Sequence, residues 1–255
     1  MRACHKLMQG IVRRVAAGLA VAVSVKLGKE AEELCSSGQC AAAAVALKLA
    51  VDLGHLPSRA LKAWLMLDVR EGVTQDRDGA FELVEEGARL GCHHCQGVMA
   101  ECYRGFGHGC EVDEARSLEL ARESSGKGSR YGQYVLGICY RHGEGGVAHD
   151  FAQSLALFQL AAAQNLDEAQ WTLGCMHSSI WHYEGLGVSK DDAEAFLWYQ
   201  LAAAQGLLYA MNKVAFCHEN GIGVRKNKAE AIRWYRRAQA ACYGGALADL
   251  QRLRS

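Results

Sequence analysis

The sequence predicts an all-α fold, an α-solenoid of about six antiparallel helix pairs followed by a C-terminal capping helix. The first observation behind this prediction is a repeat: Gly185 returns as Gly221 and Trp198 as Trp234, each after 36 residues. The second is that apolar residues within each repeat follow the 3.6-residue spacing of a helix. Repeats of this length form stacks of helix pairs, in which each unit buries its apolar faces against its neighbours.

The composition limits the classes of partner. Of the 255 residues, 50% are hydrophobic, which is enough for a large core. Lys and Arg (28) balance Asp and Glu (28), so the chain lacks the basic excess that a nucleic-acid-binding surface needs. We therefore expect no nucleic-acid partner. The 11 cysteines are an odd number at irregular spacing, which differs from a secreted disulfide scaffold and predicts reduced thiols inside a cell.

The N-terminal segment, residues 1–20, is basic, and the first acidic residue of the chain is Glu30. The apolar run from Val15 to Val25 is too short to cross a bilayer, so no transmembrane segment is predicted. A basic, acid-free, alanine-rich start is typical of a mitochondrial presequence or a short signal peptide, and it also fits a first solenoid helix. The predicted location is intracellular, either cytoplasmic or mitochondrial.

The repeat array is predicted to run from residue 21 to residue 243. Its first unit is degenerate, with a first helix from about Leu19 to Leu34 and a second from Cys40 to Leu53. Residues 244–255 are predicted to form the capping helix that closes such an array. The predicted units are 21–54, 55–91, 92–128, 129–165, 166–206 and 207–243.

The first helix of each unit is marked by a turn residue and by small side chains. Glycine or asparagine ends the preceding unit, because these residues tolerate the left-handed conformation at a helix C-terminus. Small residues follow four and nine positions later, where they let neighbouring helices approach closely. The turn residues are Gly54, Gly91, Gly128, Asn165 and Gly206, and the small residues are Ser58, Cys95, Gly132, Ala169 and Ala210, then Ala63, Ala100, Gly137, Gly174 and Ala215.

The second helix of each unit is predicted to start after a capping side chain that accepts hydrogen bonds from free backbone N–H groups. A Glu or Gln three residues later gives the spacing of a capping box in four units, so these acids have a structural role. Aromatic residues on the same helices, such as Trp198 and Tyr199, are expected to pack between adjacent units. The predicted caps are Asp76, Glu111, Asp150, Asp191 and Asn227.

These residues resemble the Sel-one-like repeat family, a relative of the tetratricopeptide repeats. Units 129–165, 166–206 and 207–243 are the closest to its pattern. Units 55–91 and 92–128 keep the glycines and alanines but show Leu83-Val84 and Leu118-Glu119 in place of the Trp-Tyr pair. The resemblance implies a right-handed superhelix with a concave groove. It also implies a role as a scaffold or adaptor in protein assemblies.

A cluster of cysteine and histidine residues is the candidate for metal or thiol chemistry. Cys92, His93, His94 and Cys95 offer ligands that zinc accepts, and a Cys-x-x-Cys can supply two of four. The repeat favours packing instead, because Cys95 falls at a small-residue position and a buried cysteine behaves as a small hydrophobe. No cofactor is predicted. A metal- or thiol-redox-handling organelle assembly factor stays as the alternative function.

The candidate partner-binding residues come from an interruption of the fifth unit. Five extra residues enter around Ser178 to His182, and insertions in solenoids often lie on the binding face, although a longer first helix with a packed Trp181 is equally compatible. Trp and Tyr are the residue types that anchor interfaces. Tyr140, His177 and His218 share one position of the repeat, expected on the groove side. The predicted contact residues are Trp181, His182, Tyr183, Tyr140, His177 and His218.

The sequence contains no nucleophile elbow, phosphate-binding loop or zinc-protease motif, so no enzyme is predicted. Packing, capping and turns account for nearly every patterned residue. The predicted function is therefore a non-enzymatic scaffold or adaptor that binds a protein or peptide in the solenoid groove, or a structural subunit of a larger complex.

Overall fold

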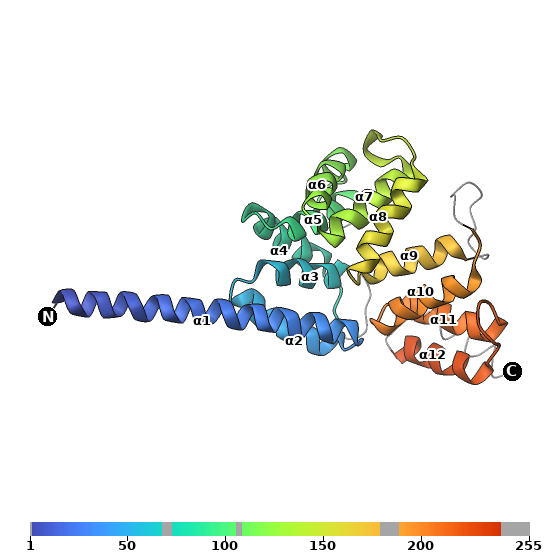
Figure 1. Ribbon diagram of the computed structural model, residues 1–255, viewed down its shortest axis with the longest axis horizontal. Coiled ribbons are helices and arrows are strands. Elements are labelled where there is room, and N and C mark those ends of the chain that lie inside the picture. Colours follow the sequence, from blue (N-terminus) through green and yellow to red (C-terminus); the bar gives the residue numbers. More distant parts are fainter. Residues whose placement is uncertain (1, 68–72, 106–108, 179–188, 241–255) are drawn as a thin grey trace.

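The computed structural model describes residues 2–67, 73–105, 109–178 and 189–240. These residues form twelve α-helices and one 3₁₀ turn, Glu144–Gly146, with no strand among them, which confirms the predicted all-α solenoid (Figure 1). The helices are α1 (Arg2–Ser36), α2 (Cys40–Asp52), α3 (Leu56–Leu67), α4 (Arg77–Arg89), α5 (His93–Arg104), α6 (Glu114–Gly126), α7 (Arg130–His142), α8 (Phe151–Ala163), α9 (Asp167–His177), α10 (Asp192–Ala204), α11 (Leu208–Asn220) and α12 (Lys228–Ala240).

Consecutive helices pack as pairs, and the pairs stack along the array. Within the described residues the pairs run from α1–α2 to α11–α12. First helices also pack on first helices, α3 on α5 and α5 on α7. The first helices α3, α5, α7, α9 and α11 are here called the inner layer. The predicted capping helix over residues 244–255 lies outside the described residues and stays a prediction.

The turn that ends each unit has the predicted left-handed backbone. The glycines at these positions have φ between 83° and 94°, a region that only glycine enters freely. Asn165 takes the same place with φ 63°. Its side-chain amide donates to Ser36 Oγ over 2.7 Å, so this turn is also joined to α1.

The small residues on the first helices make room for aromatic rings. A Cβ on Gly137 would lie 2.8 Å from Phe158 Cε1, and one on Gly174 would lie 2.7 Å from the Tyr199 ring. Both rings are buried. The ring and the glycine belong to the same helix pair. The prediction that the aromatic residues pack between adjacent units is therefore incomplete, because these rings also pack between the two helices of one unit.

In five units a capping residue joins the start of the second helix to the first helix; these second helices are α4, α6, α8, α10 and α12. Each cap side chain accepts from the backbone N–H two or three residues later, as Asp150 Oδ1 does from Gln153 at 2.9 Å. Its own backbone N–H donates back to the first helix, as from Asp150 to the Tyr140 carbonyl at 2.9 Å. The observed caps are Asp76, Asp113, Asp150, Asp191 and Asn227.

The predicted cap Glu111 is therefore wrong. Asp113 caps α6, accepting from the Arg116 N–H at 2.9 Å, while Glu111 is exposed in the connection. The register of this unit shifts by two residues, so the pair equivalent to Trp-Tyr is Leu120-Ala121 rather than Leu118-Glu119. Both Leu120 and Ala121 are buried, which supports the corrected register.

The first unit differs from the others in length. The predicted segment 1–20 and the predicted first helix form one continuous helix, α1, whose N-terminal half extends away from the body (Figure 1). The C-terminal end of α1 and the start of α2 reach distant units. Arg130 donates to Glu32 of α1 at 3.1 Å, and the Cys40 thiol of α2 donates to the Gln205 carbonyl at 3.4 Å. Among the described residues, no helix is both long and apolar enough to cross a membrane.

Candidate functional site: a pocket in the inner helix layer

The inner layer of helices surrounds a cavity of about 330 Å³, here called the inner pocket. Helices α3, α5, α7, α9 and α11 each contribute to its wall, so five successive units meet there. Its volume is at the lower end of the roughly 300–1,000 Å³ typical of ligand sites. The lining residues are Trp64, Leu67, Arg77, Glu101, Arg104, Gly105, Tyr134, Glu168 and Tyr209.

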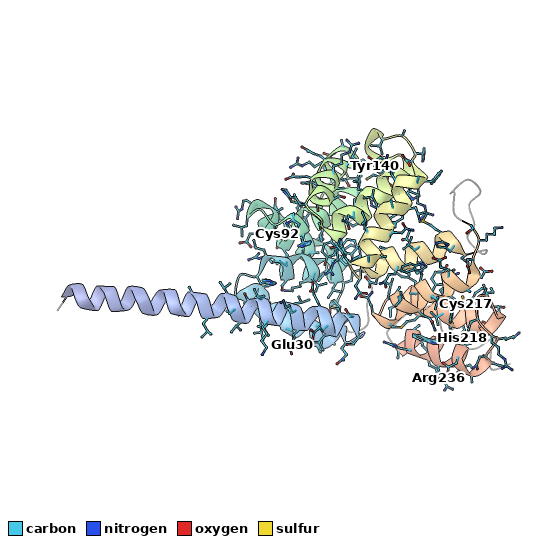
Figure 2. The ribbon with its side chains drawn as sticks, viewed as in Figure 1. Glu30, Cys92, Tyr140, Cys217, His218 and Arg236 are labelled. Atoms are coloured by element: carbon cyan, nitrogen blue, oxygen red, sulfur yellow. The ribbon has the colours of Figure 1, made fainter. Side chains whose placement is uncertain are left out.

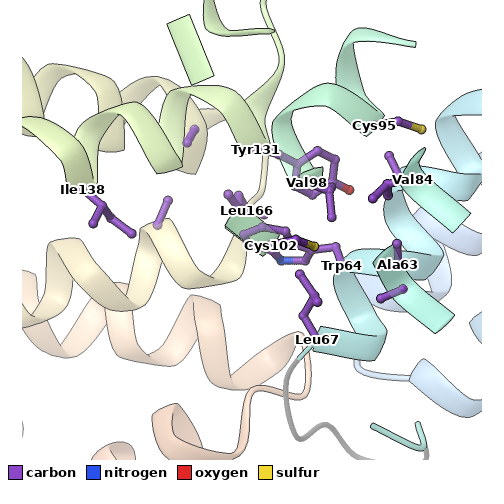
Figure 3. Close-up of a cluster of buried hydrophobic side chains, with 14 of the residues drawn as sticks. Ala63, Trp64, Leu67, Val84, Cys95, Val98, Cys102, Tyr131, Ile138 and Leu166 are labelled. Carbon is purple, nitrogen blue, oxygen red and sulfur yellow. The ribbon is translucent and has the colours of Figure 1, made fainter. Parts of the chain in front are cut away.

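Trp64 of α3 is the central residue of this wall. Its indole Nε1 donates to Glu168 Oε2 at 2.7 Å, a contact between residues 104 positions apart. Its ring meets the edge of Tyr134 with centroids 5.8 Å apart and lies 5.0 Å from the ring of Tyr131. Figure 3 shows Trp64 in the buried cluster beside Cys102 and Leu166. The coiling of the array thus brings α3 directly against α7 and α9.

The polar part of the wall is formed by Arg104 and Glu101 on α5. The guanidinium makes two hydrogen bonds to the carboxylate, Nε to Oε2 at 2.9 Å and Nη2 to Oε1 at 2.6 Å. Two-point pairing of this kind fixes both side chains and offsets their charges. Burial, together with the carboxylates of Glu101 and Glu168, raises the pKa of Tyr134 well above its ordinary value. The Tyr134 hydroxyl therefore keeps its proton at neutral pH.

Tyr209 of α11 completes the aromatic part of the pocket. Its ring packs edge-to-face on Trp171 of α9, with centroids 4.8 Å apart and planes at 79°. Three aromatic side chains from three different units, Trp64, Tyr134 and Tyr209, therefore line one cavity. Such side chains are the commonest anchors in protein interfaces.

A second cavity, of about 210 Å³, lies where α1 meets the inner layer. Trp64 lines this cavity as well, and Glu32, Cys35 and Ser36 of α1 form its other wall. The α1–α2 hairpin therefore covers part of the inner surface. No described residue of α1 or α2 lines the inner pocket.

The predicted contact residues of the repeat lie away from both cavities. Tyr140 is half-buried in a cluster with Val147 and Leu157, and Figure 2 shows it well separated from His218. His177 is buried, with Nδ1 3.6 Å from Glu194 Oε2. His218 packs edge-on against Phe196, with centroids 5.2 Å apart.

Three further predicted contact residues, Trp181, His182 and Tyr183, lie outside the described residues. A partner-binding role for all six predicted residues therefore stays a prediction.

The cysteine and histidine cluster is at the start of α5. Cys92 caps the helix, Cys95 is fully buried, and the rings of His93 and His94 lie 4.2 Å apart. Burial, with further contributions from His93 and Arg130, lowers the pKa of His94 to about 4, so its ring is neutral at pH 7. In the part of the chain that the structure describes, no group of three or more His, Cys, Asp and Glu side chains is placed to hold a metal ion.

Comparison with known proteins agrees with the repeat architecture. The family model described as Sel1 repeat matches residues 65–92, 95–129, 130–166, 167–207 and 208–238. None of the curated proteins matches the sequence.

Solved structures of two bacterial proteins share the fold. A protective antigen of uropathogenic Escherichia coli with an SLR fold has a TM-score of 0.56 and 24% identity, over 95% of this chain and 50% of the antigen. This chain therefore spans about half the length of that antigen. A Sel1 repeat protein from Oxalobacter formigenes has a TM-score of 0.56 and 19% identity, over 88% of each chain.

Proposed function

The chain belongs to the Sel1 repeat family, and from that premise we propose that it is a non-enzymatic scaffold that binds a segment of a protein or peptide along its inner helix layer. The observation that carries the proposal is the inner pocket, in which Trp64, Tyr134 and Tyr209 of three units converge. A partner segment crossing several units would place one of its side chains there.

The chemistry of the pocket supports binding rather than catalysis. Among the described residues, its lining has no Ser, Thr, Cys or His, so this part of the wall lacks the side chains of a nucleophile and base pair. Its carboxylates are engaged in structural contacts, Glu101 with Arg104 and Glu168 with Trp64. A rigid aromatic wall with satisfied polar groups is suited to hold an apolar anchor of the partner within a polar rim.

The experiment selects ligands from a random peptide library on the immobilised protein and measures their dissociation constants. Tyr209→Ala should weaken the selected peptides at least about tenfold, because it removes an aromatic wall of the pocket. Leu201→Ala is the matched control, since Leu201 is 49% exposed on the outer helix α10 and should leave the affinity unchanged. Equal binding by wild type and Tyr209→Ala, with both folded, would contradict the proposal.

The interruption of the fifth unit is a second contact region that we propose for the same partner. The support is the sequence alone: the insertion places Trp181 and Tyr183, two anchor residue types, at a point where the repeat requires no core residue. Trp181→Ala in the same titration distinguishes the two regions. Loss of affinity in Trp181→Ala but not in Tyr209→Ala would locate the binding site at the insertion and not at the inner pocket.

A further inference from the structure

The first turn of α5 holds two cysteines in a defined arrangement. Cys92 is the N-cap, and its Sγ accepts a hydrogen bond from the backbone N–H of Cys95 at 3.4 Å. Residues three apart in a helix have Cα atoms about 5 Å apart. This separation is inside the window of roughly 4.4–6.8 Å that a disulfide spans.

Cys95 points from the helix into the junction of three helices. It is fully buried, and its thiol donates to the Leu56 carbonyl at the start of α3, with a sulfur–oxygen distance of 3.6 Å. A Cβ on Gly87 of α4 would collide with the Cys95 sulfur. The Cys95 thiol therefore fills a space between α3 and α4, while the backbone N–H of Cys95 donates to the sulfur of Cys92.

The two thiols differ in acidity. Contact with the Cys95 side chain, with hydrogen bonds from the backbone N–H groups of Cys95 and His94, lowers the pKa of Cys92 below its ordinary value against the opposing effect of burial. The same contact with Cys92, together with burial, raises the pKa of Cys95 well above its usual range. One reactive thiolate beside one protonated thiol is the state found in Cys-x-x-Cys pairs at helix N-termini.

The neighbouring unit shows that the fold does not require this pair. At the equivalent first turn of α7, Ser129 is the N-cap and Gly132 takes the position of Cys95. Ser129 starts α7 without a side-chain cap hydrogen bond, and Gly132 lies close to Ser124 of α6. A helix start at this place in the repeat therefore needs neither sulfur, although in α5 one sulfur caps the helix and the other fills space.

We propose that Cys92 and Cys95 form a reversible dithiol–disulfide site that exchanges with small disulfides such as glutathione disulfide. The Cys92 thiolate attacks one sulfur of glutathione disulfide, which forms a mixed disulfide and releases one glutathione thiolate. That thiolate takes the proton of Cys95, whose sulfur then attacks the Cys92 sulfur and breaks its bond to glutathione. The second glutathione leaves as a thiolate and takes from water the proton that Cys92 gave up on ionising. Overall, the protein dithiol is oxidised to a disulfide and glutathione disulfide is reduced to two glutathione thiols.

The burial of the pair favours a small reactant. Cys92 retains 6% of its surface and Cys95 none, so a folded partner protein has little access to either sulfur. Oxidation also removes the proton with which Cys95 bonds to the Leu56 carbonyl. The oxidation state of the pair is thereby coupled to the contact between α5 and α3, the helix that carries Trp64.

The test equilibrates the folded protein with defined mixtures of reduced and oxidised glutathione, blocks the remaining thiols and identifies the bonds by peptide mass spectrometry. We expect a Cys92–Cys95 disulfide that forms and reverses with the glutathione ratio. Cys102 and Cys139 are internal controls that should stay reduced, because both are fully buried and burial raises their pKa values.

Two substitutions separate the two thiol–disulfide exchange steps. Each introduces the residue that another unit has at the equivalent position. Cys95→Ala, the residue found at this position in Ala169 and Ala210, should trap the mixed disulfide between Cys92 and glutathione. Cys92→Ser, the residue of Ser129, should leave Cys95 unmodified. Cys92 and Cys95 remaining reduced in the folded protein, while the urea-unfolded chain is oxidised in the same buffer, would overturn the proposal. Equal oxidation of all described cysteines would overturn it as well.

Discussion

Positions that carry the same residue type in several units have a different role from positions whose residue differs from unit to unit. The caps Asp76, Asp113 and Asp150 are the same residue at the same place, with the same hydrogen bond to the following turn. In contrast, the first-helix position that holds Glu168 in one unit holds Tyr209 in the next. The repeated positions build the array, and the unrepeated ones give its inner surface the side chains on which the proposed function rests.

The largest expected effect is on a repeated packing position. Phe158→Ala should lower the free energy of unfolding by about 3–5 kcal/mol, because the ring is fully buried against Gly137 and its loss leaves a cavity. Chemical denaturation monitored by circular dichroism measures the change. Leu160→Ala, on the same helix but 53% exposed, should cost less than about 0.5 kcal/mol. Similar losses for the two variants would contradict the assignment of Phe158 to the core.

The next effect compares two N-caps at the same place in the repeat, Cys92 and Ser129. Since the pKa of Cys92 is lowered from the ordinary value of 9.0, its thiolate forms at a lower pH than that of an ordinary thiol. Its alkylation by iodoacetamide should therefore reach half its maximal rate at a pH clearly below 9.0.

The charged groups around the cysteine pair are few. His93 and His94 follow Cys92 on α5, and Arg59 of α3 lies near Cys95 and is paired with Glu86 of α4. Alkylation is measured in Cys95→Ala as well, where loss of the contact with the Cys95 side chain should move the midpoint upward. A midpoint near 9 in the wild-type protein would contradict the assigned acidity of Cys92.

A smaller effect compares an inner tryptophan with an outer one. Trp64→Phe should destabilise the fold by about 1–3 kcal/mol, because the buried carboxylate of Glu168 loses the indole donor. Trp198→Phe is the matched variant, since its indole bonds to Glu194 at 3.4 Å on the exposed side of α10. We expect the Trp198 change to cost less than about 0.5 kcal/mol. Thermal unfolding of both variants measures the two losses of stability. A larger loss for Trp198→Phe than for Trp64→Phe would contradict this expectation.

The smallest effect tests the register of the third unit. Asp113→Ala should cost about 1 kcal/mol, because the first turn of α6 loses its cap. Glu111→Ala should be close to neutral, since Glu111 is exposed in the connection. Urea titration of the pair decides between the two registers, and a larger loss for Glu111→Ala would restore the register that the sequence pattern predicts.

The sequence predicts the repeated features well because they are local. A turn glycine, a small residue and a capping acid each act within a few positions, so their spacing shows directly in the chain. The error at Glu111 arose because Glu111 and Asp113 are both acceptors close to the start of α6. Because two acceptors lie so close together, the sequence alone does not determine which of them caps α6. The first residue of the helix in the structure decides this.

The inner pocket could not be predicted in the same way. Trp64, Tyr134 and Tyr209 fall at different positions of three different units, so no period relates them. They meet because the array coils tightly enough to bring α3 against α9, as the bond from Trp64 to Glu168 shows. The repeat length predicts a stack of helix pairs but not how sharply the stack winds.

The most direct test of the binding surface is photo-cross-linking of a selected peptide that carries a photoreactive side chain at its anchor position. Mass spectrometry of the digested complex locates the attachment. We predict cross-links to α3, α7 and α11, the helices that carry the three aromatic residues of the inner pocket. Cross-links confined to the outer helices α8 and α10 would contradict the central claim that the inner layer binds the partner.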